Sequence, residues 1–339
     1  AWSDLSETPR AWRKSRLEAL AVVSFDQLQE WERDQVAWIF GHEDAIELLP
    51  KIEFSPAWLE FLRTTKALKP TSAAEWSLAQ WAAKRLHAED AFREIHKLSD
   101  KLGPAAAGII DRALTAQQDE KIPPNLEKAW RLLTIVVRAK RNNDHWHRSI
   151  ALNRIRANQA TSADLAEAIE HYVPRVRLHE PYSFDTDQGP DSLSGLCRVE
   201  LEADENSDIN EFLNALQPGS RHLWPALQIA SGALLQSLGL AIDAELAGAA
   251  IENASVDVPS ISAHEQNKHR GGFLFLTRVC AELWLKVHAA ESDRAYAIGG
   301  LWKQAGFALT TRLWLFTLHE RDRPPSEIVQ ELLLLPLDD

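Results

Sequence analysis

The sequence predicts an all-α protein, either a HEAT- or armadillo-like helical array or an irregular helical bundle, with a small β element near residues 173–203. Across most of the chain, apolar residues recur every three or four positions, which is the spacing of a helix with one buried face. Between residues 173 and 203 apolar and polar residues alternate instead, as in a half-buried strand. Helix pairs recur at roughly 35–45 residues without an exact internal repeat, and this rhythm favours the array.

Consecutive antiparallel helices are expected between about residues 10 and 171. Gly and Pro mark helix boundaries in "KLGPAAAG" and "KIPPNLEKAW", and Ser or Thr caps the helix that begins in "TSADLAEAI". Two stripes spaced by three or four residues should face the core: Leu126, Trp130, Leu133 and Val137, and Trp76, Ala79, Ala83 and Leu86.

The middle of the chain differs in character. "YVPRVRLHEP" and "LSGLCRVELEAD" alternate like short strands, and "YSFDTDQGPDS" between them is polar and rich in turn residues. Its three aspartates do not follow the pattern of a calcium-binding EF-hand loop. Because this loop has little to bury, we expect deletion of Ser183–Ser194 to cost little stability.

Helices resume at about Ser207 and continue to the end of the sequence. The segment Leu223–Ile251 is apolar and rich in small residues, so we expect a long buried helix there. Trp284 and Trp314 lie on strongly apolar helices and should belong to the core, where Trp→Ala costs roughly 3–5 kcal/mol. A third stripe consists of Leu276, Val279, Leu283 and Val287. The domains expected are a helical array over 1–171, a β and loop element over 172–205, and a helical domain over 206–339.

Composition limits the function classes. Lys and Arg number 37 against 49 Asp and Glu, so the net charge is −12 and a protein partner is favoured over nucleic acid. Cys197 and Cys280 lie in apolar contexts and are expected to be reduced core thiols of a cytoplasmic protein. No apolar run reaches the roughly 20 residues that span a bilayer, so no membrane association is expected. Methionine is absent and the sequence starts at Ala1, which indicates a fragment of a longer chain or methionines missing from the written sequence.

Motifs of catalysis and cofactor binding are weak or absent. No G-x-S-x-G, G-x-G-x-x-G or P-loop pattern occurs, so we expect no nucleotide or other cofactor. His264 and His269 are five residues apart, which on a helix turns the two rings by about 140° from one another, and "DHWH" lacks a third ligand cluster. No metal site is therefore expected. Arg141, Asn142 and His147 in "RNNDHWH" resemble the short motif of HEPN ribonucleases, in which Arg would stabilise phosphorane charge and His would move a proton. A polar turn between helices explains the same residues.

The segment "VPSISAHEQNKHRGG" (Val258–Gly272) is the most polar stretch among the C-terminal helices. Ser262 and Glu265 have the spacing of a capping box, and Gly271 and Gly272 should end the capped turn. Two interpretations remain for the other polar groups: they satisfy backbone groups at a helix junction, or they contact a partner. The candidate binding residues are His264, Gln266, Asn267, His269 and Arg270.

"DVPSISAHEQN", "LWLKVHAAESDRAYAIGGLWKQ" and "RLWLFTLHERDRPPSEIVQELLLLP" together resemble the C-terminal helical region of very large bacterial anti-phage defence proteins. The N-terminal part of those proteins resembles a sirtuin, and the helical region is a domain of unknown function. The resemblance is best over residues 195–339. It implies a scaffold or sensor region of a longer effector whose sirtuin-like part would consume NAD. No sirtuin nucleotide-binding motif occurs in this chain, so that activity is not expected here.

We therefore expect a non-catalytic helical scaffold that mediates protein–protein contacts or oligomerisation through self-association or recognition of a phage protein. The alternative is a HEPN-like, metal-independent ribonuclease that uses Arg141 and His147.

Overall fold

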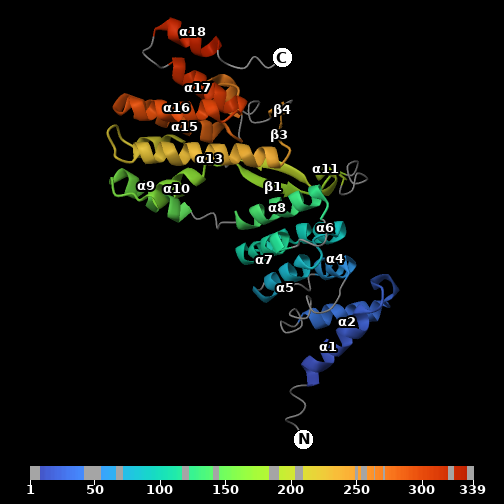
Figure 1. The fold of residues 1–339 in the computed structure, drawn as a ribbon. Helices are drawn as coiled ribbons and strands as arrows, with labels where there is room; N and C mark the ends of the chain where they lie inside the picture. Colours follow the sequence, from blue (N-terminus) through green and yellow to red (C-terminus); the bar gives the residue numbers. More distant parts are fainter. Residues whose placement is uncertain are drawn as a thin grey trace. The chain divides into compact units, whose positions relative to one another are not determined.

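Helices make up most of the described chain, and two short strand pairs accompany them (Figure 1), so the predicted all-α class with a small β element is confirmed. The structure is a computed structural model, and it describes residues 8–41, 55–65, 72–116, 122–139, 145–182, 191–202, 209–248, 251–252, 258–262, 264–269, 272–319 and 324–333. The chain divides into two compact units, which are residues 1–142 with 176–200, and residues 143–175 with 201–339.

This division differs from the three segments predicted from the sequence. The predicted helical array extended to residue 171, but helices α9 (His145–Arg156) and α10 (Ser162–Glu170) pack against α12 (Ile209–Ala215) and α13 (Leu223–Asp243). They therefore belong to the second unit. Most of the strand pair formed by β1 (Arg175–His179) and β2 (Arg198–Glu202) groups with the first unit and is not a separate segment.

The first unit is a series of helices that pack both on the next helix along the chain and on the next but one. Helix α5 packs on α7, and α7 packs on α8. Its elements, apart from the strands, are α1 (Thr8–Ala21), η2 (Phe25–Gln27), α2 (Glu30–Phe40), α4 (Pro56–Thr64), α5 (Ser72–Ala83), α6 (Glu89–Lys97), η3 (Ser99–Lys101), α7 (Pro104–Ala116), α8 (Pro124–Arg138) and α11 (Leu193–Leu196).

One of the two predicted stripes in this unit is confirmed, and the other is confirmed in part. Helix α8 begins with proline, whose fixed φ suits the first helical turn, and its stripe is buried at Leu126, Trp130, Leu133 and Val137. In the second stripe, Ala79 is buried on α5 and Leu86 is buried just beyond the end of the helix, but Trp76 is 48% exposed. The buried side of α5 also includes Ala74, Leu78, Trp81 and Ala82, and the helix packs on α7.

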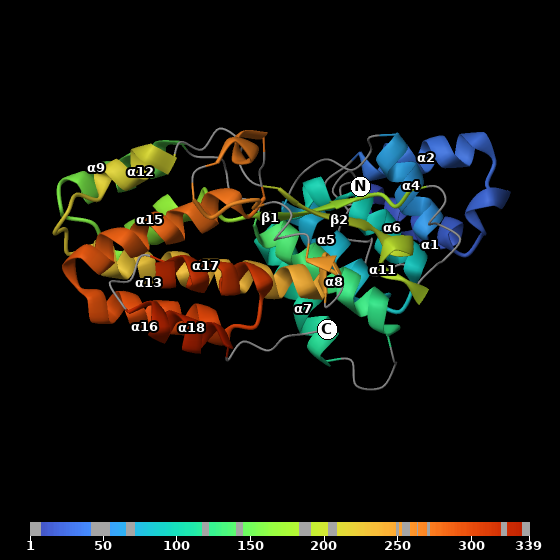
Figure 2. The ribbon, with the colours of Figure 1, turned by 90° about the horizontal axis from the view of Figure 1, so that it is seen from above.

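The second unit is built around α13 and α15 (Leu274–Ala290), which pack side by side (Figure 2). Helix α10 also packs on α13, α16 packs on α15, and α17 packs on α16. Its other elements are β3 (Ala247–Gly248), β4 (Ile251–Glu252), η5 (Glu265–His269), α16 (Ser292–Gln304), α17 (Ala308–His319) and α18 (Pro325–Leu333). The predicted α15 stripe is buried, and so are Trp284 and Trp314, which confirms both as core residues.

Helix α13 is shorter than the sequence predicted. It ends at Asp243, because Glu245 adopts a left-handed conformation with φ of 61°. The N–H of Leu246 donates to the carbonyl of Ala241, and the N–H of Glu245 donates to that of Ile242. These bonds form a Schellman motif with Glu at a position that usually holds Gly. Beyond it, β3 pairs with β4 in antiparallel register where the sequence predicted continued helix.

By length and composition alone, α13 could cross a membrane. Part of its apolar surface packs against α10 and α15, and Leu227, Ala230, Leu234 and Leu238 are fully buried.

Candidate functional site

The polar segment between Val258 and Gly272 is organised around one buried amide. Asn267 is 8% exposed, and its Nδ2 donates to the carbonyls of Ser260 at 2.9 Å and Ser262 at 3.1 Å. Its Oδ1 accepts from the N–H of Ser260 at 3.3 Å. Asn267 thus satisfies backbone groups across the segment. Its predicted exposure as a contact residue is wrong, because both ends of its amide face inward to these groups.

The remaining candidate residues of this segment lie on or beside the short helix η5. His264 and Gln266 are exposed, and the N–H of Gln266 donates to Nδ1 of His264 at 3.2 Å. His264 thereby caps the turn, and the capping box of Ser262 with Glu265 stays a prediction. The backbone of His269 belongs to η5, whereas its side chain and all of Arg270 lie outside the described residues. Gly272 has φ of 55°, a conformation that suits glycine at the end of the turn.

The predicted ribonuclease residues are described only in part. Arg141 and Asn142 lie outside the described residues, and His147 is exposed on α9. The arrangement of the three residues is therefore not tested, and the ribonuclease interpretation stays a prediction. RNA cleavage by the wild type and its loss in His147→Ala would support it.

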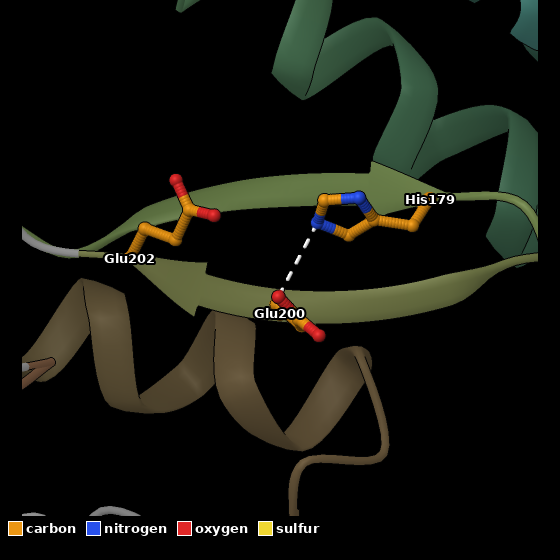
Figure 3. A group of neighbouring side chains, drawn as sticks. All are labelled: His179, Glu200 and Glu202. Atoms are coloured by element: carbon orange, nitrogen blue, oxygen red, sulfur yellow. Dashed lines mark ion pairs between the residues drawn. The ribbon is translucent and has the colours of Figure 1, made fainter.

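A group of potential metal ligands occurs on the β1–β2 pair, which the sequence analysis did not identify (Figure 3). The strands run antiparallel, and alternation places Glu200 and Glu202 on one face of β2 with His179 beside them on β1. The opposite face carries Val176, Val199 and Leu201, which are buried or half-buried. The strand pattern therefore directs apolar residues to one face and gathers the imidazole and both carboxylates on the other.

The three side chains can each offer one donor atom, and these atoms all lie within 4.8 Å of one another. Nε2 of His179 lies 3.3 Å from Oε2 of Glu200 (Figure 3). The other oxygen of Glu200, Oε1, accepts from Nη1 of Arg198 at 2.7 Å. Nη1 of Arg198 also donates to the hydroxyl of Tyr182 at 2.6 Å, and its guanidinium lies over the Tyr182 ring.

Behind the strand pair, α6 contributes a buried histidine. His96 is 7% exposed and its ring stacks on Phe92. Burial lowers the pKa of His96 below its ordinary value of 6.5, although a hydrogen bond to the backbone of Leu178 on β1 and the charge of Glu180 oppose this shift. Neutral His96 therefore helps to attach β1 to the first unit.

Other groups with nucleophilic chemistry serve the core. Cys197 and Cys280 are buried and are not joined in a disulfide, as the sequence predicted. Burial raises the pKa of the Cys280 thiol, although the neighbouring Ser231 hydroxyl opposes this shift. Since the thiolate is the reactive form, Cys280 is unsuited to nucleophilic catalysis.

The signal for the His179 group was present in the sequence. "RVRLH" and "RVELE" were both recognised as alternating strands, and two glutamates at positions i and i+2 must share a strand face. Which residue of β1 lies beside them depends on the pairing of the strands, and the long connection from residue 180 to 197 does not fix that pairing.

Comparison with known proteins gives one relative and no family. The chain is 26% identical over 336 residues to the uncharacterized protein y4cA of Sinorhizobium fredii (strain NBRC 101917 / NGR234). The aligned region covers 97% of this chain and 28% of that relative, so the chain spans less than a third of its length. No protein-family model and no solved structure matches the chain.

Proposed function

We propose that this chain is a non-catalytic helical scaffold within a larger bacterial anti-phage defence protein, and that it mediates protein–protein contacts or self-association in the cytoplasm. The observation that carries the proposal is that Asn267 binds the backbone of Ser260 and Ser262 and so anchors this polar segment, while His264 and Gln266 stay exposed. The similarity of nearly the whole chain to part of a much longer bacterial protein supports a role within a larger assembly.

A pre-organised polar segment is suited to recognition because little conformational entropy is lost when it binds. His264 and Gln266 supply directional hydrogen bonds without a permanent apolar patch. The net charge of −12 disfavours a phosphate-rich partner and favours a protein. In this proposal Gln266 and Arg270 contact the partner, and Asn267 holds the segment in place.

The test uses the full-length protein with Gln266→Arg, which introduces a bulky charge at the proposed contact. The matched control is Gln217→Arg, since Gln217 is also an exposed glutamine of the second unit. Sedimentation velocity reports self-association, and efficiency of plating in cells that express the protein reports phage restriction. We expect Gln266→Arg to reduce assembly or restriction and Gln217→Arg to leave both unchanged. If both variants match the wild type at equal abundance, the contact role of this segment is rejected.

A further inference from the structure

We propose that His179, Glu200 and Glu202 form a binding site for a zinc-like divalent cation on the polar face of the β1–β2 pair. The proposal is independent of the scaffold role. It rests on three observations: the donor atoms converge, the His–Glu separation matches a zinc site, and the carboxylate of Glu200 is held in one orientation (Figure 3).

The separation of the donor atoms fits tetrahedral coordination. Zinc lies about 2.0–2.1 Å from imidazole nitrogen and carboxylate oxygen, so two ligand atoms of a tetrahedron are roughly 3.3–3.4 Å apart. Nε2 of His179 and Oε2 of Glu200 are already 3.3 Å apart. The donor atom of Glu202 lies within 4.8 Å of both, and this side chain is exposed and long enough to move closer by rotation.

Neighbouring side chains hold the carboxylate of Glu200. Arg198 binds Oε1, and Tyr182 in turn accepts a hydrogen bond from Arg198, so Oε2 is directed toward His179 as a single donor. Such outer interactions orient metal ligands. Among the described residues, Nε2 of His179 is shielded from solvent and has no partner besides the ion pair with Glu200, as expected of a nitrogen that is arranged to coordinate a metal.

The donor set selects the class of cation. One imidazole with two carboxylates suits Zn²⁺ and related transition metals, whereas Mg²⁺ and Ca²⁺ prefer sites built from oxygen alone. The two carboxylates balance the charge of a divalent ion. Three protein ligands leave a fourth tetrahedral position for water or for a donor from another molecule.

The experiment is a titration of the metal-free 339-residue chain with Zn²⁺ by calorimetry, and with Co²⁺ by visible absorption, which is strong for tetrahedral Co²⁺. We expect one ion per chain and an increase in melting temperature with Zn²⁺, because an ion that binds only the folded chain stabilises it. Loss of a residue that only hydrogen-bonds to a metal ligand typically weakens metal binding about 10- to 100-fold. Because Glu202 is itself a proposed ligand, Glu202→Gln should weaken Zn²⁺ binding by at least that factor.

Glu180→Gln is the matched control, because it removes the same charge from the residue next to His179 without removing a proposed ligand. We expect this variant to bind Zn²⁺ as the wild type does. His179→Gln should lose the tetrahedral Co²⁺ spectrum, and circular dichroism without metal checks that each variant is folded. Three outcomes overturn the proposal: no stoichiometric binding, equal weakening by Glu180→Gln and Glu202→Gln, or equal affinity for Zn²⁺ and Mg²⁺.

Discussion

Asn267 illustrates how a single buried side chain determines the role of its neighbours. We predict that Asn267→Ala destabilises the second unit by about 1–3 kcal/mol, because the backbone groups of Ser260 and Ser262 lose their partner. Urea unfolding followed by tryptophan fluorescence measures the change. Gln266→Ala on the same short helix is the control, and since Gln266 is exposed its effect should stay within about 0.5 kcal/mol. Equal effects of the two variants would show that the amide does not hold the segment.

His96 should make the first unit sensitive to mild acid. Its pKa in the folded state is below 6.5, so the unfolded chain binds the proton more strongly. Stability is therefore fully present above pH 6.5 and falls as the pH decreases from 6.5 through the folded pKa. We predict that His96→Gln loses less stability than the wild type between about pH 7.5 and about pH 5. A parallel dependence in both proteins, measured by urea unfolding, would assign the acid sensitivity to other groups.

At the scale of residues, the sequence predicted apolar burial well where a helix carries one dominant stripe. Leu126, Trp130 and Val137 on α8 are all buried as expected. Trp76 was misplaced because α5 is apolar on several faces, and the choice of buried face depends on how α7 packs against it. Asn267 and His264 were identified as unusual, but the sequence could not show which of them faces inward, because that depends on the path of the backbone.

At the scale of elements, the connection between β1 and β2 should consist of two parts that differ in how much they contribute to stability. Residues 183–190 lie outside the described residues, and for this polar stretch the small cost of deletion stays a prediction. Residues 191–194 are part of the fold, so the predicted small cost of deleting all of Ser183–Ser194 needs correction. The carbonyl of Asp191 accepts from Asn125, Ser192 caps α11, and Leu193 is 2% exposed.

We predict that replacing residues 183–190 by a short Gly-Ser linker leaves the melting temperature nearly unchanged. Deletion of 183–194 should instead lower the stability of the first unit by about 2–5 kcal/mol, because it removes a buried leucine together with a helix cap. Thermal unfolding followed by circular dichroism compares the two proteins. The linker variant serves as the control for shortening the connection, and equal melting temperatures would contradict the structural role of residues 191–194.

Helix boundaries show why element-scale prediction succeeded at some positions and failed at others. The sequence predicted the start of α10 correctly, since Thr161 and Asp164 form the reciprocal capping box that "TSAD" suggests. The sequence did not predict the end of α13, because the residue in the left-handed conformation there is Glu245 and not the usual Gly or Asn. Similarly, both strands of the β1–β2 pair were predicted, but the group of His179, Glu200 and Glu202 requires their pairing.

At the scale of the whole molecule, each unit has a buried tryptophan that links its own helices. In the first unit, Nε1 of Trp130 on α8 donates to the carbonyl of Leu86 at 3.0 Å. In the second unit, Nε1 of Trp284 on α15 donates to the carbonyl of Ala295 on α16 at 2.7 Å. The connected core around Trp284 contains only residues of the second unit. The two units should therefore lose stability separately when one core is damaged.

We predict that Trp284→Ala costs the second unit roughly 3–5 kcal/mol, because it removes both a large apolar volume and the partner of a buried carbonyl. Hydrogen exchange followed by mass spectrometry should then show faster exchange in peptides from 143–175 and 201–339, with little change in the other peptides. Trp130→Ala is the reciprocal variant and should affect 1–142 and 176–200. Where either alanine variant fails to fold, Trp→Phe provides a milder change with the same expected pattern. Uniform acceleration of exchange by either variant would mean that the two units unfold as one cooperative structure.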